Sequence, residues 1–150
     1  MRKFLLLAAL VEIPERYRKA ALEITEVMSN SGGATDDWWE LTNAGSSAVD
    51  LNGYYWDDNG PNGNDGALFG SFIINPGQSV VISEIDAAAF QNVWGSGITV
   101  LDQTFFSAPD TFSGLSSGGD QIELWDADPN LGGTFNLVAS VSFGAATRGT

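Results

Sequence analysis

The chain has 150 residues, 43% of them hydrophobic, which suits one domain with an apolar core and is too short for two. It contains no cysteine and no histidine, which excludes disulfides, thiolate metal sites and the usual general base and zinc ligand. The formal net charge is −13, and five of the six basic residues precede residue 20. We therefore expect no binding of nucleic acid, and no binding of anionic membranes by the body of the chain.

The first twenty residues form a segment of their own. Arg2 and Lys3 precede an apolar run over 4–11, which is typical of a secretory signal and too short to span a bilayer. Residues 12–19 are charged where a small-residue cleavage region is expected, and Pro14 also suits the first turn of a short helix. We divide the chain into a signal-like or helical segment, 1–20, and a domain, 21–150, and expect a secreted or cell-surface protein.

Alternating runs separated by turn-forming residues follow along the chain. Two aromatic-rich runs, 38–43 and 49–58, flank a connection of small residues and predict two strands that form a β-hairpin. The other predicted strands are 22–28, 67–74, 79–83, 98–101, 121–125 and 136–143. The strand at 79–83 is expected to return against 67–74 across a turn at 75–78. Asp86 is expected to cap a short helix over 87–94 that ends at Gly95, with Phe90 and Trp94 on one face sealing an end of the core.

About eight short strands at this spacing predict an all-β fold, a two-sheet antiparallel β-sandwich with one short helix near 87–94. Six of the runs are also familiar as a series. They are ITEVM at 24–28, WELTN at 39–43, AVDLNGY at 48–54, INPGQSVVI at 74–82, GDQIEL at 119–124 and VASVSFG at 138–144. In this order the chain resembles a lamin tail domain, in particular the bacterial secreted branch of that family. The resemblance implies an immunoglobulin-like sandwich and a non-catalytic module, with no fixed catalytic residues to carry over.

Oxygen-bearing side chains crowd two of the turns. A calcium ion takes six to eight oxygen ligands from flexible, Gly-containing loops. The first candidate set is Asp57, Asn59, Asn62, Asn64 and Asp65, and the second is Asp126, Asp128 and Asn130. The first set is not an EF-hand, because the spacing to a glutamate at the twelfth position is absent. The alternative is that Asp, Asn and Gly simply make good turns.

Aromatic residues supply the third candidate site. Trp38, Tyr55, Trp56 and also Trp125 can stack on sugar rings if they are exposed, and the alternative is that they fill the core. The expected partners are a protein, a polysaccharide, or a second copy through an unpaired edge strand. The alternative from another class is a carbohydrate-active or other hydrolytic domain using Asp/Glu pairs. We expect no enzyme, because the usual nucleophile and base motifs are missing and Glu40 and Glu123 sit where strands face solvent.

Overall fold

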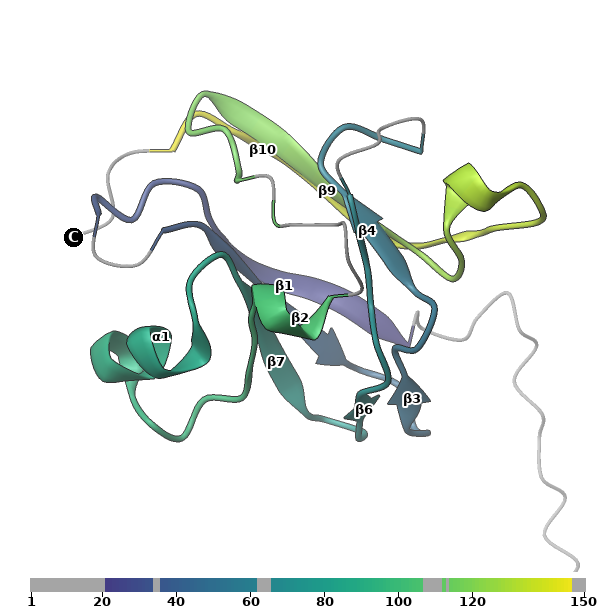
Figure 1. Cartoon of the computed structure of the whole chain (residues 1–150), viewed down its shortest axis with the longest axis horizontal. Helices are drawn as coiled ribbons and strands as arrows, with labels where there is room; N and C mark the ends of the chain where they lie inside the picture. Colours follow the sequence, from purple (N-terminus) through teal and green to yellow (C-terminus); the bar gives the residue numbers. More distant parts are fainter. Residues whose placement is uncertain (1–20, 34–35, 62–65, 107–111, 113, 147–150) are drawn as a thin grey trace, which may run out of the picture.

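Two four-stranded sheets pack face to face in the computed structural model, which describes residues 21–33, 36–61, 66–106, 112 and 114–146 (Figure 1). The first sheet has the order β1 (Leu22–Met28), β2 (Trp38–Asn43), β7 (Ser79–Ser83) and β8 (Val100–Leu101). The second has the order β10 (Leu137–Gly144), β9 (Gly119–Trp125), β4 (Tyr55–Asp57) and β5 (Ala67–Leu68). A small pair, β3 (Val49–Asp50) and β6 (Ile73–Ile74), closes one end. The predicted β-sandwich is therefore confirmed.

Alternation within the strands builds the core. Trp39 and Leu41 point inward from β2, Trp56 points inward from β4, and Ile122 and Leu124 point inward from β9, all essentially without solvent exposure. The rings of Trp39 and Trp56 meet between the sheets, with centroids 5.4 Å apart. Burying large apolar side chains of this kind stabilises a fold by about 25 cal/mol per Å². The core thus depends on one tryptophan from each sheet.

The helix α1 (Ala87–Trp94) lies on the outer face of the first sheet (Figure 1). Asp86 caps it by accepting a hydrogen bond from the Ala89 N–H at 2.9 Å, and the helix ends at Gly95, where φ is 119°. Phe90 is buried against Trp38 in a second, smaller apolar cluster, whereas Trp94 remains partly exposed. The predicted helix and its cap are confirmed.

The predicted β-hairpin of 38–43 with 49–58 is wrong. β2 pairs with β1 and β7, whereas β4 pairs with β5 and β9, so the chain crosses from one sheet to the other between them. The run 49–58 is interrupted by a turn at Gly53, where φ is 83°. Crossing lets Trp39 and Trp56 face each other through the core, where both indoles are buried.

The predicted return of 79–83 against 67–74 is also wrong. The turn at 75–78 forms as predicted, with the Gln78 N–H donating to the Asn75 carbonyl at 2.9 Å. The run 67–74 however splits into β5 and β6, and β7 pairs with β2 on one side and with β8 on the other. β8 runs parallel to β7 because α1 supplies the crossover between them.

Two 3₁₀ helices, η2 (Gln103–Phe105) and η3 (Pro129–Leu131), complete the secondary structure of the described residues. Within those ranges, no helix has the length and apolar character needed to cross a bilayer. The predicted segment 1–20 lies outside the described residues.

Replacing Trp39 with alanine should lower the free energy of unfolding by about 3–5 kcal/mol, because a cavity would open between the sheets. Trp39→Phe should cost much less, since the indole N–H of Trp39 has no hydrogen-bond partner among the described residues and the smaller ring keeps most of the apolar contact. Urea unfolding measures both. Leu131→Ala is the control, because Leu131 is 78% exposed and its loss should change stability by less than about 0.5 kcal/mol. Equal costs at positions 39 and 131 would contradict this account of the core.

Candidate functional site

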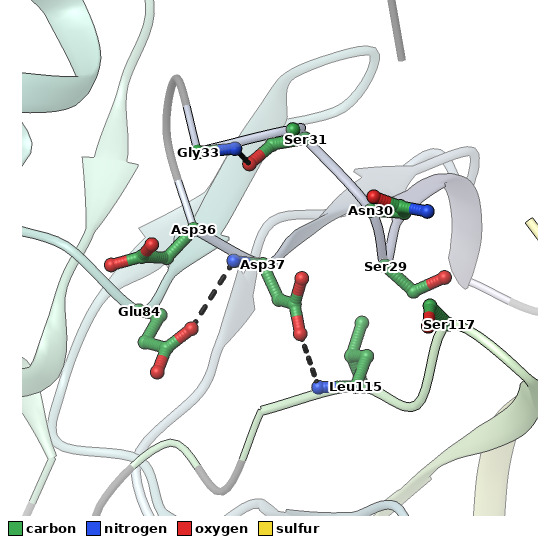
Figure 2. Close-up of a pocket in the computed structure, with 10 residues that line it drawn as sticks. Ser29, Asn30, Ser31, Gly33, Asp36, Asp37, Glu84, Leu115 and Ser117 are labelled. Atoms are coloured by element: carbon green, nitrogen blue, oxygen red, sulfur yellow. Dashed lines mark hydrogen bonds between the residues drawn. The ribbon is translucent and has the colours of Figure 1, made fainter. Parts of the chain in front are cut away.

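A polar groove of about 620 Å³ lies where the loop after β1 meets the end of β7 (Figure 2). Its lining includes three carboxylates, from Asp36, Asp37 and Glu84, which we call the acidic groove. Figure 2 shows Asp36 and Glu84 on one side of the groove, Ser29 with Ser117 on the other, and Asp37 between them. The groove is therefore rich in hydrogen-bond acceptors and negative charge.

Strand pairing brings the acids together. Trp38 pairs with Ser83, so the preceding Asp37 and the following Glu84 are neighbours at the same end of the sheet. The Asp37 N–H donates to Glu84 Oε2 at 3.2 Å, and the Glu84 N–H donates to the Asp37 carbonyl at 3.1 Å. The Leu115 N–H donates to Asp37 Oδ2 at 2.6 Å, which ties the groove to the segment before β9.

Burial and mutual repulsion make the charged forms of Asp37 and Glu84 less favourable in this groove. Burial raises the pKa of the Asp37 carboxyl above its ordinary value, and the charges of Asp36 and Asp120 raise it further, against the lowering effect of the Leu115 N–H. Burial likewise raises the pKa of Glu84, with the charges of Asp36 and Asp37 adding to the rise and the Asp37 N–H opposing it. Between Lys19 and Arg148 the sequence holds no basic residue that could relieve this repulsion.

Sequence reasoning missed the acidic groove. The Ser, Asn, Gly and Asp residues of 29–37 predict only a loop between two strands. Glu84 lies far from it in sequence, and the pairing of β2 with β7 was not predicted. Only that pairing brings the side chains together.

The first predicted calcium loop is described in part. Asn62, Asn64 and Asp65 lie outside the described residues. Asp57 is fully buried, and its Oδ1 accepts from the Asn59 N–H at 2.7 Å, which is the turn-forming contact of the alternative interpretation.

Glu123 is a neighbour of this loop that the sequence did not suggest. It pairs with Asp57 across β9 and β4, and its Oε2 is buried beneath Gly60 without a hydrogen-bond partner among the described residues. The expectation that Glu123 faces solvent is thus wrong for this carboxylate oxygen, because the loop folds over it.

The second predicted calcium set has turn-forming contacts. Asp126 accepts hydrogen bonds from the Asn136 N–H at 2.7 Å and from Asn136 Nδ2 at 2.8 Å, and these bonds lower the pKa of its carboxyl. Asp128 caps η3 through the Asn130 N–H at 2.8 Å, and Asn130 Nδ2 donates to the Tyr55 hydroxyl at 3.2 Å. Across the described residues, no group of three Asp or Glu side chains is placed to hold a metal ion.

The aromatic candidates are all buried. Trp38 lies under α1, Trp56 lies in the core, and Tyr55 packs against Trp125 below the loop that carries Asn130. The premise that these rings are exposed for stacking on sugars is wrong. Both neighbours in each pair are covered because a helix or a loop packs over the outward-facing member.

The fold and these surfaces define an immunoglobulin-like β-sandwich with polar sites at its loops. A family model described as Lamin Tail Domain matches residues 15–145. The chain belongs to this family of non-catalytic immunoglobulin-like domains, which confirms the resemblance to a lamin tail domain. No curated protein sequence matches the chain.

The raised pKa values predict a pH dependence of stability. A carboxyl whose pKa is higher in the folded state costs no stability while it is protonated, below its ordinary pKa of about 4, and its full cost is present above the raised value. Stability should therefore decline as pH rises from about 4 through the folded pKa values of Asp37 and Glu84.

The D37N/E84Q double variant should show a smaller decline across this range in urea unfolding at a series of pH values. E23Q/E26Q removes two carboxyls outside the groove and is the matched control. A D37N/E84Q variant that kept the full wild-type decline would contradict the assignment.

Proposed function

We propose that this lamin tail domain is a non-catalytic, extracytoplasmic module that binds a basic segment of a partner protein in the acidic groove. The observation that carries the proposal is the convergence of Asp36, Asp37 and Glu84 on one groove, in a chain without a basic residue between Lys19 and Arg148. The signal-like start of the sequence and the resemblance to the bacterial secreted branch support the location.

Lysine and arginine side chains fit the chemistry of the groove. Their positive charge would stabilise the carboxylate forms of Asp37 and Glu84, which the groove disfavours. Both side chains donate hydrogen bonds and accept none, which matches a lining rich in acceptors. The lining offers carboxylates on one side and hydroxyl groups on the other, with Ser29 only 6% exposed. Bound cations would lower the two raised pKa values and relieve the repulsion between the acids.

Protein is favoured over polysaccharide as the partner because the rings that would stack on sugars are buried. The hydrolytic alternative is less well supported for a related reason. One oxygen of Asp37 and one of Glu84 are held by backbone N–H groups, at 2.6 and 3.2 Å, which suits a positioned acceptor rather than a proton-transferring pair.

A labelled oligolysine peptide tests the groove. The D36N/E84Q variant should bind it roughly tenfold more weakly than wild type, since two carboxylate–ammonium contacts of up to about 1 kcal/mol each are lost. E23Q/E26Q changes the net charge equally but outside the groove, and should stay close to wild type. Fluorescence anisotropy measures binding, which added salt should weaken. Equal losses in both variants would show attraction by net charge alone and would overturn the proposal.

A second proposal concerns stability. We propose that calcium is held near the loop that follows β4, where buried Asp57 pairs with Glu123 of β9. The observation in its favour is Glu123 Oε2, which is buried without a hydrogen-bond partner among the described residues. A calcium ion would supply the positive charge for this oxygen, with amide and carbonyl oxygens completing its ligands.

Calcium at about 100 times its dissociation constant should add about 2.7 kcal/mol and raise the melting temperature by about 5–10 °C relative to chelator. Glu123→Gln should reduce the shift, whereas Glu40→Gln, at a strand glutamate of the other sheet, should retain it. Differential scanning calorimetry with calcium and with chelator measures both. An unchanged melting temperature in wild type would remove the proposal.

A further inference from the structure

The four edges of the two sheets are protected to very different degrees. β5 and β8 have two residues each, which offers little backbone to another strand. β1 carries Glu23 and Glu26 and has an irregular register between Ile24 and Glu26, so charge and shape both disfavour pairing. Short strands, charges and bulges are the usual means by which proteins prevent edge-to-edge association.

β10 lacks most of this protection. It has eight residues, with no charged residue and no proline, and its irregular register is confined to the start, between Leu137 and Ala139. Among the described strands it lies at the outer edge of its sheet and pairs with β9 alone. In a chain of net charge −13, pairing through an uncharged strand avoids placing carboxylates of the two copies directly opposite each other.

The side chains of β10 are divided between the two faces of the sheet. Ala139, Val141 and Phe143 are half-buried and pack against the core, whereas Ser140 and Ser142 are exposed on the other face. The apolar members therefore keep accessible surface that a further strand at this edge would cover.

We propose that two copies of this chain pair through β10, antiparallel and centred on Val141. This register places Ala139 opposite Phe143 of the second copy, small against large, on the core face. It places Ser140 opposite Ser142 on the outer face. The two second sheets then form one continuous sheet across a two-fold axis. The proposal rests on the domain's proposed role in protein contacts, but it uses none of the residues that line the acidic groove.

Charge placement on the outer face tests both the pairing and its register, using the full chain. In S140K/S142K, each new lysine lies opposite a lysine of the second copy, and the dimer should weaken at least about tenfold. In S140K/S142E, each lysine lies opposite a glutamate, and the dimer should persist. Registers centred on Ser140 or Ser142 would instead place like charges opposite each other in this variant.

Sedimentation velocity over a range of concentrations measures the dimer, and near-UV circular dichroism confirms the fold of each variant. S46K/S47K adds the same charge on an exposed loop and should dimerise at least as well as wild type, since it reduces the net negative charge. Added salt should strengthen the dimer by screening repulsion, whereas it should weaken peptide binding in the acidic groove. The two proposals can therefore fail independently.

Three results would overturn the dimer. The first is a wild-type chain that is monomeric at all concentrations. A β10 edge that pairs with a strand of another protein, and not with a second copy, would count as this result. The second is an S140K/S142K variant that dimerises as tightly as wild type. The third is an S140K/S142E variant that dissociates like S140K/S142K.

Discussion

The contact between Trp39 and Trp56 is the interaction on which the rest of the structure depends. Each indole comes from a different sheet, and the ring of Phe69 packs edge-on against Trp39 with centroids 6.5 Å apart. Neither indole N–H has a hydrogen-bond partner among the described residues, so their contribution is apolar packing. To bring them together the chain must leave the first sheet after β2 and enter the second at β4. That crossing fixes the sandwich topology and, with it, the positions of the loops.

The acidic groove follows from the same topology. β2 packs its inner face on the core and is paired on both sides, with β1 and with β7. Pairing with β7 aligns Asp37 with Glu84, and a groove of repelling carboxylates forms at the end of the sheet. A protein without internal cations retains such an arrangement at a cost in stability, which is typical of a surface that acts on a partner. The β10 edge shows the complementary feature, an uncharged surface in an otherwise acidic domain.

Much of the fold could be predicted from the sequence, because its signals are local. The alternation in 22–28 and 79–83, the Asp86 cap and the Gly95 stop each depend on neighbours a few residues away, and each formed as predicted. The six runs that resemble a lamin tail domain extended the prediction from single strands to the β-sandwich. Strand partners were less accessible, since a small connection such as 44–48 is compatible with a hairpin and with a crossover. The candidate site could not be predicted, because its acids flank β2 and β7, two strands whose pairing the sequence does not indicate.

The sequence by itself determined the class of secondary structure, the bends, the lack of cysteine and histidine chemistry, and the acidic balance of the domain. Period-two alternation and Gly- and Asp-rich turns are properties of consecutive residues, and charge is a sum over the chain. The tertiary structure decided which aromatic rings are covered, which acids meet, and which strand edge remains open. Those outcomes depend on contacts between residues far apart in the chain, which form only when the two sheets close over the tryptophans.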